Sequence, residues 1–405
     1  MTSQLAKRAA DITPFYVMEL LRRAKQLEAQ GRDIIHMEIG EPDFATPKTI
    51  VDAGIRQLQI GDIKYTPAAG LPELREKIAA YYQARYSVKI NKERIFVTPG
   101  ASGAVLLALG VSVNPGDEIL MADPCYPCNS NFVRLFEGKA KTLPVDATTN
   151  YQLTSNLIMQ HWSQSTKGAL IASPSNPTGT LIEPEVFKQC IESVNDKSGC
   201  FYSDEIYHGL VYGKNAPTAL EYSDNVFVIS SFSKYFGMTG WRVGWLIVPD
   251  EFVEVTEKLA QNIFIATPTL SQFAALAAFD ESTLEELETR RAEFTARRDF
   301  LYNALVHLGF EIPVKPDGAL YIYANCAKFT NDSYQFALDL LEAEGVAITP
   351  GKDFGSHKAQ HHIRFAYTTS IERMAVAMQR LERFINHKMI NQEKPCPSNN
   401  SLPLN

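Results

Sequence analysis

Apolar residues in the middle of the chain occur in short runs that are separated by stretches with helical periodicity. Runs of this length are typical of strands buried on both faces, and their alternation with helices, for example at 101–112 and 184–194, is typical of a parallel sheet. The pattern predicts a three-layer α/β/α domain with a mostly parallel seven-stranded sheet. From about residue 93 the runs are "RIFVTPG", "EILMADP", "AKTLPVD", "GALIASP", "CFYSDE", "VFVISS" and "RVGWLIVP".

The pattern changes after about residue 250. A long helical stretch, "STLEELETRRAEFTARRDFLYNALVHLG", closes at Gly309 and precedes short strands such as "ALYIYANC" and "HIRFAYT" and a last helix, "SIERMAVAMQRLERFI". The first 30 residues contain an amphipathic helix, "YVMELLRRAKQLEAQG". We expect a large domain (46–285), a smaller α+β domain (286–386) joined by the N-terminal segment (1–45), and a polar, disordered tail (387–405).

The composition excludes several classes of protein. The chain has 405 residues, of which 45% are hydrophobic, and a net charge of -7. No basic block suggests a nucleic-acid partner, and no apolar run approaches the roughly 20 residues that span a bilayer. The N-terminus lacks an apolar signal region, and six cysteines in so long a chain do not form a disulfide framework. We therefore expect a cytoplasmic protein that binds neither nucleic acid nor a membrane.

Cys125 and Cys128, in "DPCYPCN", have the C-x-x-C spacing of redox and zinc sites. Zinc requires further ligands, and the chain has no second C-x-x-C and no suitably spaced pair of histidines. We therefore interpret this stretch as a loop shaped by its prolines, and we expect no metal site.

Polar and aromatic side chains follow the apolar runs, at the edge where a parallel sheet binds its ligands. Taken alone, each has an ordinary explanation, such as a tight turn, a helix cap or core packing. Their convergence on one edge indicates a binding site. These residues are Ala101 and Ser102 in "GASG", Tyr126, Asn176 in "SPSNPTG", Asp204 and Tyr207 in "SDEIY", and Ser231 and Lys234 in "SSFSK".

Two cations, Lys234 and Arg242, lie close together in the stretch "VISSFSKYFGMTGWRVGW". A lysine amine can form a Schiff base with a carbonyl cofactor. The guanidinium of an arginine matches a phosphate, and "GASG" at the start of a helix can bind the same anion. The stretch therefore indicates a cofactor that carries both a carbonyl group and a phosphate.

Together these motifs resemble the class I and II aminotransferases, the fold-type I enzymes that depend on pyridoxal 5′-phosphate (PLP). The resemblance covers residues 12 to 385 and is carried by "SFSK" with "GMTGWRVGW", "SPSNPTG", "SDEIY", "MEIGEPDF" and "KYTPAAGLPELREKI". It implies a homodimeric transaminase that moves an amino group from an L-amino acid to a 2-oxo acid such as 2-oxoglutarate. It also implies that the peptide bond before Pro177 is cis.

The resemblance further implies a role for each site residue. Lys234 would form the internal aldimine with PLP and move the α-proton, and Asp204 would hold the protonated pyridine nitrogen. Arg364 would bind the α-carboxylate of the substrate, Asn176 would also contact the substrate, and Gly40 would lie over it. Tyr207 and Asn176 would hydrogen-bond to the phenolic oxygen of PLP, and Tyr126 would stack on its ring. The phosphate would be held by Ala101, Ser102, Ser231, Arg242 and, from the neighbouring subunit, Tyr65.

Two positions depart from the family members that act on aspartate and glutamate. Some of those enzymes take an arginine from the partner subunit where this chain has Asn262, and others use a lysine in the phosphate loop where this chain has Ser102. Both departures remove a cation that would bind a side-chain carboxylate. The donor therefore stays open between aspartate, alanine and another neutral or aromatic amino acid.

Other functions share parts of the pattern. A PLP-dependent C–S β-lyase on the same fold would need the same lysine and phosphate site, but it would release ammonia and pyruvate without an amino acceptor. A PLP-binding transcriptional regulator would need a DNA-binding domain, and the short segment before the large domain already matches the enzyme family. An α/β hydrolase would need G-x-S-x-G, and Ala104 stands at the second glycine position.

Overall fold

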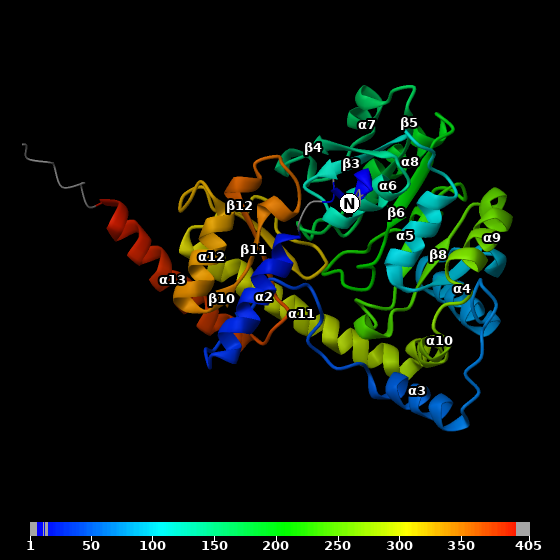
Figure 1. Cartoon of the computed structure of the whole chain (residues 1–405), viewed down its shortest axis with the longest axis horizontal. Coiled ribbons are helices and arrows are strands. Elements are labelled where there is room, and N and C mark those ends of the chain that lie inside the picture. Colours follow the sequence, from blue (N-terminus) through cyan, green and yellow to red (C-terminus); the bar gives the residue numbers. More distant parts are fainter. Residues whose placement is uncertain (1–5, 11, 13–14, 394–405) are drawn as a thin grey trace, which may run out of the picture.

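The seven apolar runs form one sheet, as the sequence predicts. The computed structural model of the chain describes residues 6–10, 12 and 15–393 (Figure 1). Strand β8 is antiparallel to both of its neighbours, β2 and β7, and the other neighbouring pairs are parallel. Across the sheet, the strands are β2 (Ile95–Thr98), β8 (Gly244–Ile247), β7 (Phe227–Ser231), β6 (Cys200–Asp204), β5 (Thr166–Ala172), β3 (Glu118–Asp123) and β4 (Lys139–Pro144).

Each face of this sheet packs against its own group of helices. One buried cluster contains Val97 and Phe201, and the other contains their strand neighbours Phe96 and Tyr202. Burial of both faces explains why the strands lack a polar alternation, and it confirms the three-layer α/β/α arrangement. The first cluster includes residues of α3 (Lys48–Ile60), α4 (Pro72–Tyr86), α7 (Ser155–His161), α8 (Pro184–Asn195) and α10 (Thr269–Leu276), and the second includes residues of α5 (Gly100–Gly110), α6 (Pro127–Leu135) and α9 (Val253–Ile263).

Segments from the N-terminal and the C-terminal parts of the chain form a smaller α+β unit, as expected. Strand β1 (Ile35–His36) pairs in parallel with β10 (Val346–Ala347). A second, antiparallel sheet has the order β11 (Thr349–Pro350), β12 (His362–Ala366) and β9 (Tyr321–Asn325). Figure 1 shows this unit beside the large sheet. The helices of this unit are α2 (Tyr16–Ala29), α12 (Ser333–Glu344) and α13 (Ile371–Glu393). The short helix α1 (Lys7–Ala10) precedes α2 in the chain.

Helix α11 (Glu281–Leu308) extends from the large unit to the smaller one (Figure 1). It ends where the sequence indicates, because its C-cap Gly309 has a φ of 94°, a left-handed conformation that glycine adopts without strain. The expected domain boundary at 285 falls inside this helix. The domain limits therefore stay predictions.

The C-terminal helix α13 is longer than its sequence pattern indicates. It continues to Glu393, past residue 387, where the expected tail begins, so residues 387–393 are helical. Residues 394–405 of that tail lie outside the described residues. None of the described helices has the length and apolar character that a membrane span requires. The cytoplasmic location stays a prediction from composition.

Candidate active site

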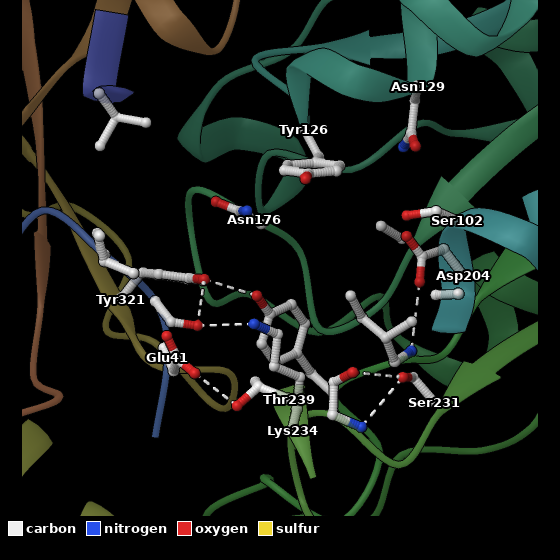
Figure 2. A pocket seen from close by; sticks show the side chains of 18 of the residues that line it. Glu41, Ser102, Tyr126, Asn129, Asn176, Asp204, Ser231, Lys234, Thr239 and Tyr321 are labelled. Carbon is white, nitrogen blue, oxygen red and sulfur yellow. Dashed lines mark hydrogen bonds between the residues drawn. The ribbon is translucent and has the colours of Figure 1, made fainter. Parts of the chain in front are cut away.

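One cavity of about 450 Å³ lies where the carboxyl ends of β5, β6 and β7 face the smaller unit. Figure 2 shows Tyr126, Asn176, Asp204 and Lys234 pointing into the same space. Every site residue predicted from the sequence except Tyr65 lines this cavity. The lining includes Gly40, Ala101, Ser102, Tyr126, Asn176, Asp204, Tyr207, Ser231, Lys234, Arg242 and Arg364.

Lys234 follows the carboxyl end of β7 and is half-buried. Its Nζ donates a hydrogen bond of 2.7 Å to the carbonyl oxygen of Gly40 and lies 5.9 Å from the centre of the Tyr207 ring. Gly40 comes from the segment that follows β1, so this bond joins the large and the smaller unit. The amine is therefore held inside the cavity by a neutral acceptor.

Asp204 is the last residue of β6, and its side chain is only 7% exposed. Desolvation raises the pKa of this carboxyl from 3.8 to about 6, and a backbone N–H, from Ile206 to Oδ1 at 3.3 Å, opposes the shift. A buried carboxylate with so little support gains free energy when a cation comes close.

Arg364 lies on β12, is 5% exposed and hydrogen-bonds to neutral acceptors. Its Nη1 donates to Asn176 Oδ1 at 2.9 Å, and its Nη2 donates to the carbonyl oxygen of Glu38 and to Thr349 Oγ1. Its buried Nε has no hydrogen-bond partner among the described residues. The ring centre of Tyr321 lies 4.2 Å from its Cζ. A rigidly held guanidinium with a donor to spare is suited to a carboxylate.

The N-terminus of α5 and Arg242 form a second group of donors. Helix α5 begins at Gly100, whose φ is 69°, and it has no side-chain N-cap. A Cβ at Gly100 would lie 2.5 Å from Arg242 Nη2, so glycine is required for this close approach. Ser102 and Ser231 add hydroxyl groups to the same lining. Uncapped helix N–H groups, hydroxyls and a guanidinium are the donors that bind a phosphate.

The charged side chains at these places do not neutralise one another. Within the described parts of the chain, the hydrogen bonds of Asp204, Lys234, Arg242 and Arg364 go to backbone groups or neutral side chains. These three cations and the Asp204 carboxylate thus line a single cavity with neutral partners, and two further carboxylates of the lining, Glu38 and Glu41, contact His36 and Thr239 respectively. This arrangement favours a ligand that brings its own charges.

Tyr65 and Asn262 both lie outside the cavity lining. Tyr65 is 81% exposed, and its expected contact is with a neighbouring subunit, so it stays a prediction. Asn262 is exposed on α9, and its Nδ2 donates to the carbonyl oxygen of Lys258. The peptide bond between Asn176 and Pro177 is cis, as the resemblance implies.

Sequence reasoning missed several residues that line the cavity. Among them are Tyr321 on β9, Asn129 and Phe132 on α6, and the side chains at the start of α2. Tyr321 lies in a strand of the smaller unit, and no motif marks it. Its position depends on how that unit packs against the large sheet, which the apolar pattern does not specify.

Comparison with known proteins identifies the family. The aminotransferase class I and II family matches residues 32–381. A (5-formylfuran-3-yl)methyl phosphate transaminase from Methanocaldococcus jannaschii is 40% identical to this chain, and the match covers 94% of this chain and 100% of the relative. A valine–pyruvate aminotransferase from Mycobacterium tuberculosis is 35% identical, and the match covers 94% of this chain and 98% of the relative. The crystal structure of an aminotransferase from Mycobacterium tuberculosis has a TM-score of 0.92 at 34% identity, covering 95% of this chain and 100% of that one. The chain therefore belongs to the class I and II aminotransferases, enzymes that transfer amino groups and generally depend on PLP.

Proposed function

We propose that this chain binds PLP covalently through Lys234 and moves an amino group from an apolar L-amino acid to a 2-oxo acid. The observation that carries the proposal is that Asp204, Lys234, Arg242 and Arg364 line one cavity with only neutral partners among the described residues. PLP has an aldehyde, a basic ring nitrogen and a phosphate, and the substrate has an α-carboxylate. When it is bound, PLP supplies an electron sink for the bonds at the substrate α-carbon.

The residues present fit this cofactor. Asp204 would pair with the protonated ring nitrogen, which would supply the cation that its buried carboxylate lacks. The uncapped start of α5, Arg242 and Ser231 would hold the phosphate. Tyr126 would lie against the ring, and Tyr207 and Asn176 would donate to the phenolic oxygen.

Arg364 and Lys234 would act on the substrate. Arg364 would bind the α-carboxylate in a bidentate pair, because its guanidinium lines the cavity and Asn176 already orients it. Lys234 would take the α-proton as a general base and return it as a general acid. The carbonyl of Gly40, 2.7 Å from Nζ, would hold the amine near that proton.

A C–S β-lyase reaction on the same residues is the second candidate. The match to the aminotransferase family and the transaminase names of the relatives support transamination instead. Release of ammonia and pyruvate without an amino acceptor would show that the chain is a lyase.

The cavity lining supports a donor with an apolar side chain. Its cations are Lys234, Arg242 and Arg364, and each already has a role in the proposal. A distal carboxylate would thus be desolvated without a cation from the described part of this chain, which costs free energy. The valine–pyruvate relative is named for a donor of this kind, although other relatives at 32–34% identity are named aspartate aminotransferases. The larger aliphatic and phenylalanine side chains of the lining are Phe15, Val17, Met18, Ile39, Val105, Phe132 and Ile206.

Donors with apolar side chains are expected to react faster than aspartate. With 2-oxoglutarate or pyruvate as acceptor, the kcat/KM of leucine, valine or phenylalanine should exceed that of aspartate by about tenfold or more, since an unpaired buried charge costs at least about 1–3 kcal/mol. Asparagine matches aspartate in size without its charge, so it should also exceed aspartate. Each donor is tested by the absorbance change of the bound cofactor in the absence of acceptor. Faster reaction with aspartate than with asparagine would reveal a cation contributed by the partner subunit.

We also propose a homodimer in which Tyr65 reaches the phosphate of the neighbouring site. The last residue of α3, Ile60, and Ile63 and Tyr65 in the segment that follows are exposed, and large apolar side chains exposed so close together are typical of an interface. Tyr65 does not line the cavity of its own chain, so its exposed side chain is available to a neighbouring subunit.

Tyr65→Phe is expected to weaken PLP binding by about tenfold or more, because it removes a hydrogen bond to a charged group. Mixed dimers identify which subunit supplies Tyr65. When Tyr65→Phe chains are mixed with Lys234→Ala chains, one site of each mixed dimer would combine an intact Lys234 with an intact Tyr65, and tight PLP binding should return. If mixing restores no tight site, Tyr65 does not act across the interface.

A further inference from the structure

We propose that Tyr321 is a positioning residue that strengthens Tyr207 as a hydrogen-bond donor and fixes the orientation of Arg364. The inference rests on the proposed function, in which Tyr207 contacts the phenolic oxygen of PLP and Arg364 binds the α-carboxylate. Tyr321 is the first residue of β9, so a residue of the smaller unit would act on two groups at once.

The contacts of Tyr321 come from separate segments of the chain. Tyr321 is 2% exposed, its Oη lies 2.6 Å from Tyr207 Oη, and the two rings pack edge to face at 5.8 Å and 83°. The same Oη lies 3.5 Å from the carbonyl oxygen of Gly40, which also accepts the hydrogen bond from Lys234. Figure 2 shows Tyr321 and Lys234 connected through these bonds.

Gly40 leaves room for this hydroxyl. A Cβ at Gly40 would lie 1.7 Å from Tyr321 Oη, far inside van der Waals contact. The backbone of Gly40 does not have a positive φ, so the contact with Tyr321 is the reason that a side chain is excluded. Any other residue at position 40 would displace the Tyr321 hydroxyl.

The short contact between Tyr207 and Tyr321 fixes which hydroxyl donates. A tyrosine has one hydroxyl proton, so when Tyr207 donates to the cofactor, Tyr321 must donate to Tyr207 at 2.6 Å, and its longer contact of 3.5 Å with the Gly40 carbonyl then receives no proton. A hydroxyl that accepts a hydrogen bond becomes a stronger donor itself. Burial raises the pKa of Tyr207 well above its usual value, so this donor keeps its proton. The titratable and charged groups that face it are Tyr126, Lys234, Tyr321 and Arg364.

The ring of Tyr321 supports Arg364. The guanidinium Cζ lies 4.2 Å from the ring centre, which is within the range of a cation–π contact, and Asn176 Oδ1 accepts from Nη1. β9 and β12 are neighbouring antiparallel strands, and Tyr321 pairs with Ala366, two residues from Arg364. The ring and the strand pairing together limit how the guanidinium can turn.

Two substitutions at Tyr321 separate the hydroxyl from the ring. Tyr321→Phe should raise the pH midpoint of the absorbance transition of bound PLP by about 0.3–1 units, since a weaker Tyr207 donor no longer stabilises the deprotonated phenolic oxygen. Its affinity for an unreactive monocarboxylate, 3-phenylpropanoate, should change by less than about twofold. Tyr321→Leu should weaken binding of that carboxylate by about tenfold or more, because the ring beside Arg364 is lost.

Tyr323→Phe is the matched control. Tyr323 lies two residues along the same strand and is 5% exposed, and its hydroxyl has no partner among the described residues. It does not line the cavity, so neither measurement should change. An unchanged midpoint in Tyr321→Phe, or unchanged carboxylate binding in Tyr321→Leu, would overturn this inference alone. A wild-type protein that takes up no PLP would overturn it together with the proposed function.

Discussion

Lys234→Ala is expected to abolish covalent PLP binding and to lower steady-state transamination by about 10⁴-fold or more. Lys234 is the one lysine among the described residues that line the cavity, so no other amine there can bind the aldehyde or take the α-proton. General acid–base catalysis alone typically contributes 10²–10⁴-fold, and loss of the covalent attachment adds to this. Turnover with the preferred donor and the absorbance of the bound cofactor measure the two effects.

A surface lysine provides the control for this substitution. Lys188 on α8 has a side chain that is 46% exposed and pairs with Glu192, and it lies outside the cavity lining. Lys188→Ala should therefore retain the cofactor absorbance and the turnover. Steady-state transamination by Lys234→Ala would contradict the role assigned to this amine.

Asp204→Asn is expected to lower turnover by about 10³-fold and to stabilise the protein without PLP at pH values above 6. An amide cannot hold the ring nitrogen in its protonated form, so the ring becomes a weaker electron sink. A turnover that is about 10³-fold lower corresponds to a loss of about 4 kcal/mol of transition-state stabilisation.

The stability effect follows from the raised pKa of Asp204. Burial raises this pKa from 3.8 to about 6, so the folded protein binds the proton more tightly than the unfolded chain does. The stability that comes from this proton is fully present below pH 3.8 and is lost as the pH rises through 6. At pH 8 the folded state carries a buried charge, at a cost of about 3 kcal/mol, which a neutral asparagine avoids.

The neighbouring Glu205 makes a matched control for Asp204. Its buried carboxyl accepts hydrogen bonds from Ser203, Thr218 and Ala219 and does not line the cavity. Desolvation raises its pKa to about 7. Glu205→Gln should change turnover by less than about threefold, whereas Asp204→Asn with wild-type turnover would contradict the proposed pairing. Thermal unfolding of the PLP-free proteins at pH 5 and pH 8 tests the stability effect.

The apolar pattern was sufficient to predict the large sheet and the edge where a site forms. Strands buried on both faces give continuous apolar runs, and their ends in a parallel sheet meet at one edge, so Asn176, Asp204 and Lys234 could be expected together. Each lies in or just after a strand whose position the pattern predicts. The cavity is lined by all three.

The contribution of the smaller unit was harder to predict. Arg364 was predicted through the family resemblance, whereas Tyr321, in a buried strand two residues before Tyr323, carries no distinguishing motif. The sequence pattern predicts both tyrosines to be core residues. Only the packing of the two units places Tyr321 in the cavity lining and Tyr323 outside it. Contacts between units far apart in sequence have no local signal. The domain limits have no local signal either, since the continuous helix α11 crosses one of them.

Every role proposed for the cavity depends on the covalent attachment of PLP to Lys234, and trapping of this bond by borohydride reduction is the direct test. Purified wild-type protein is incubated with PLP, reduced with borohydride, digested and analysed by mass spectrometry. The phosphopyridoxyl group should be found on the peptide that contains Lys234 and should be absent from the same peptide of a protein reduced without PLP. Stoichiometric labelling of a different lysine, or no labelling at all, would contradict the proposed attachment.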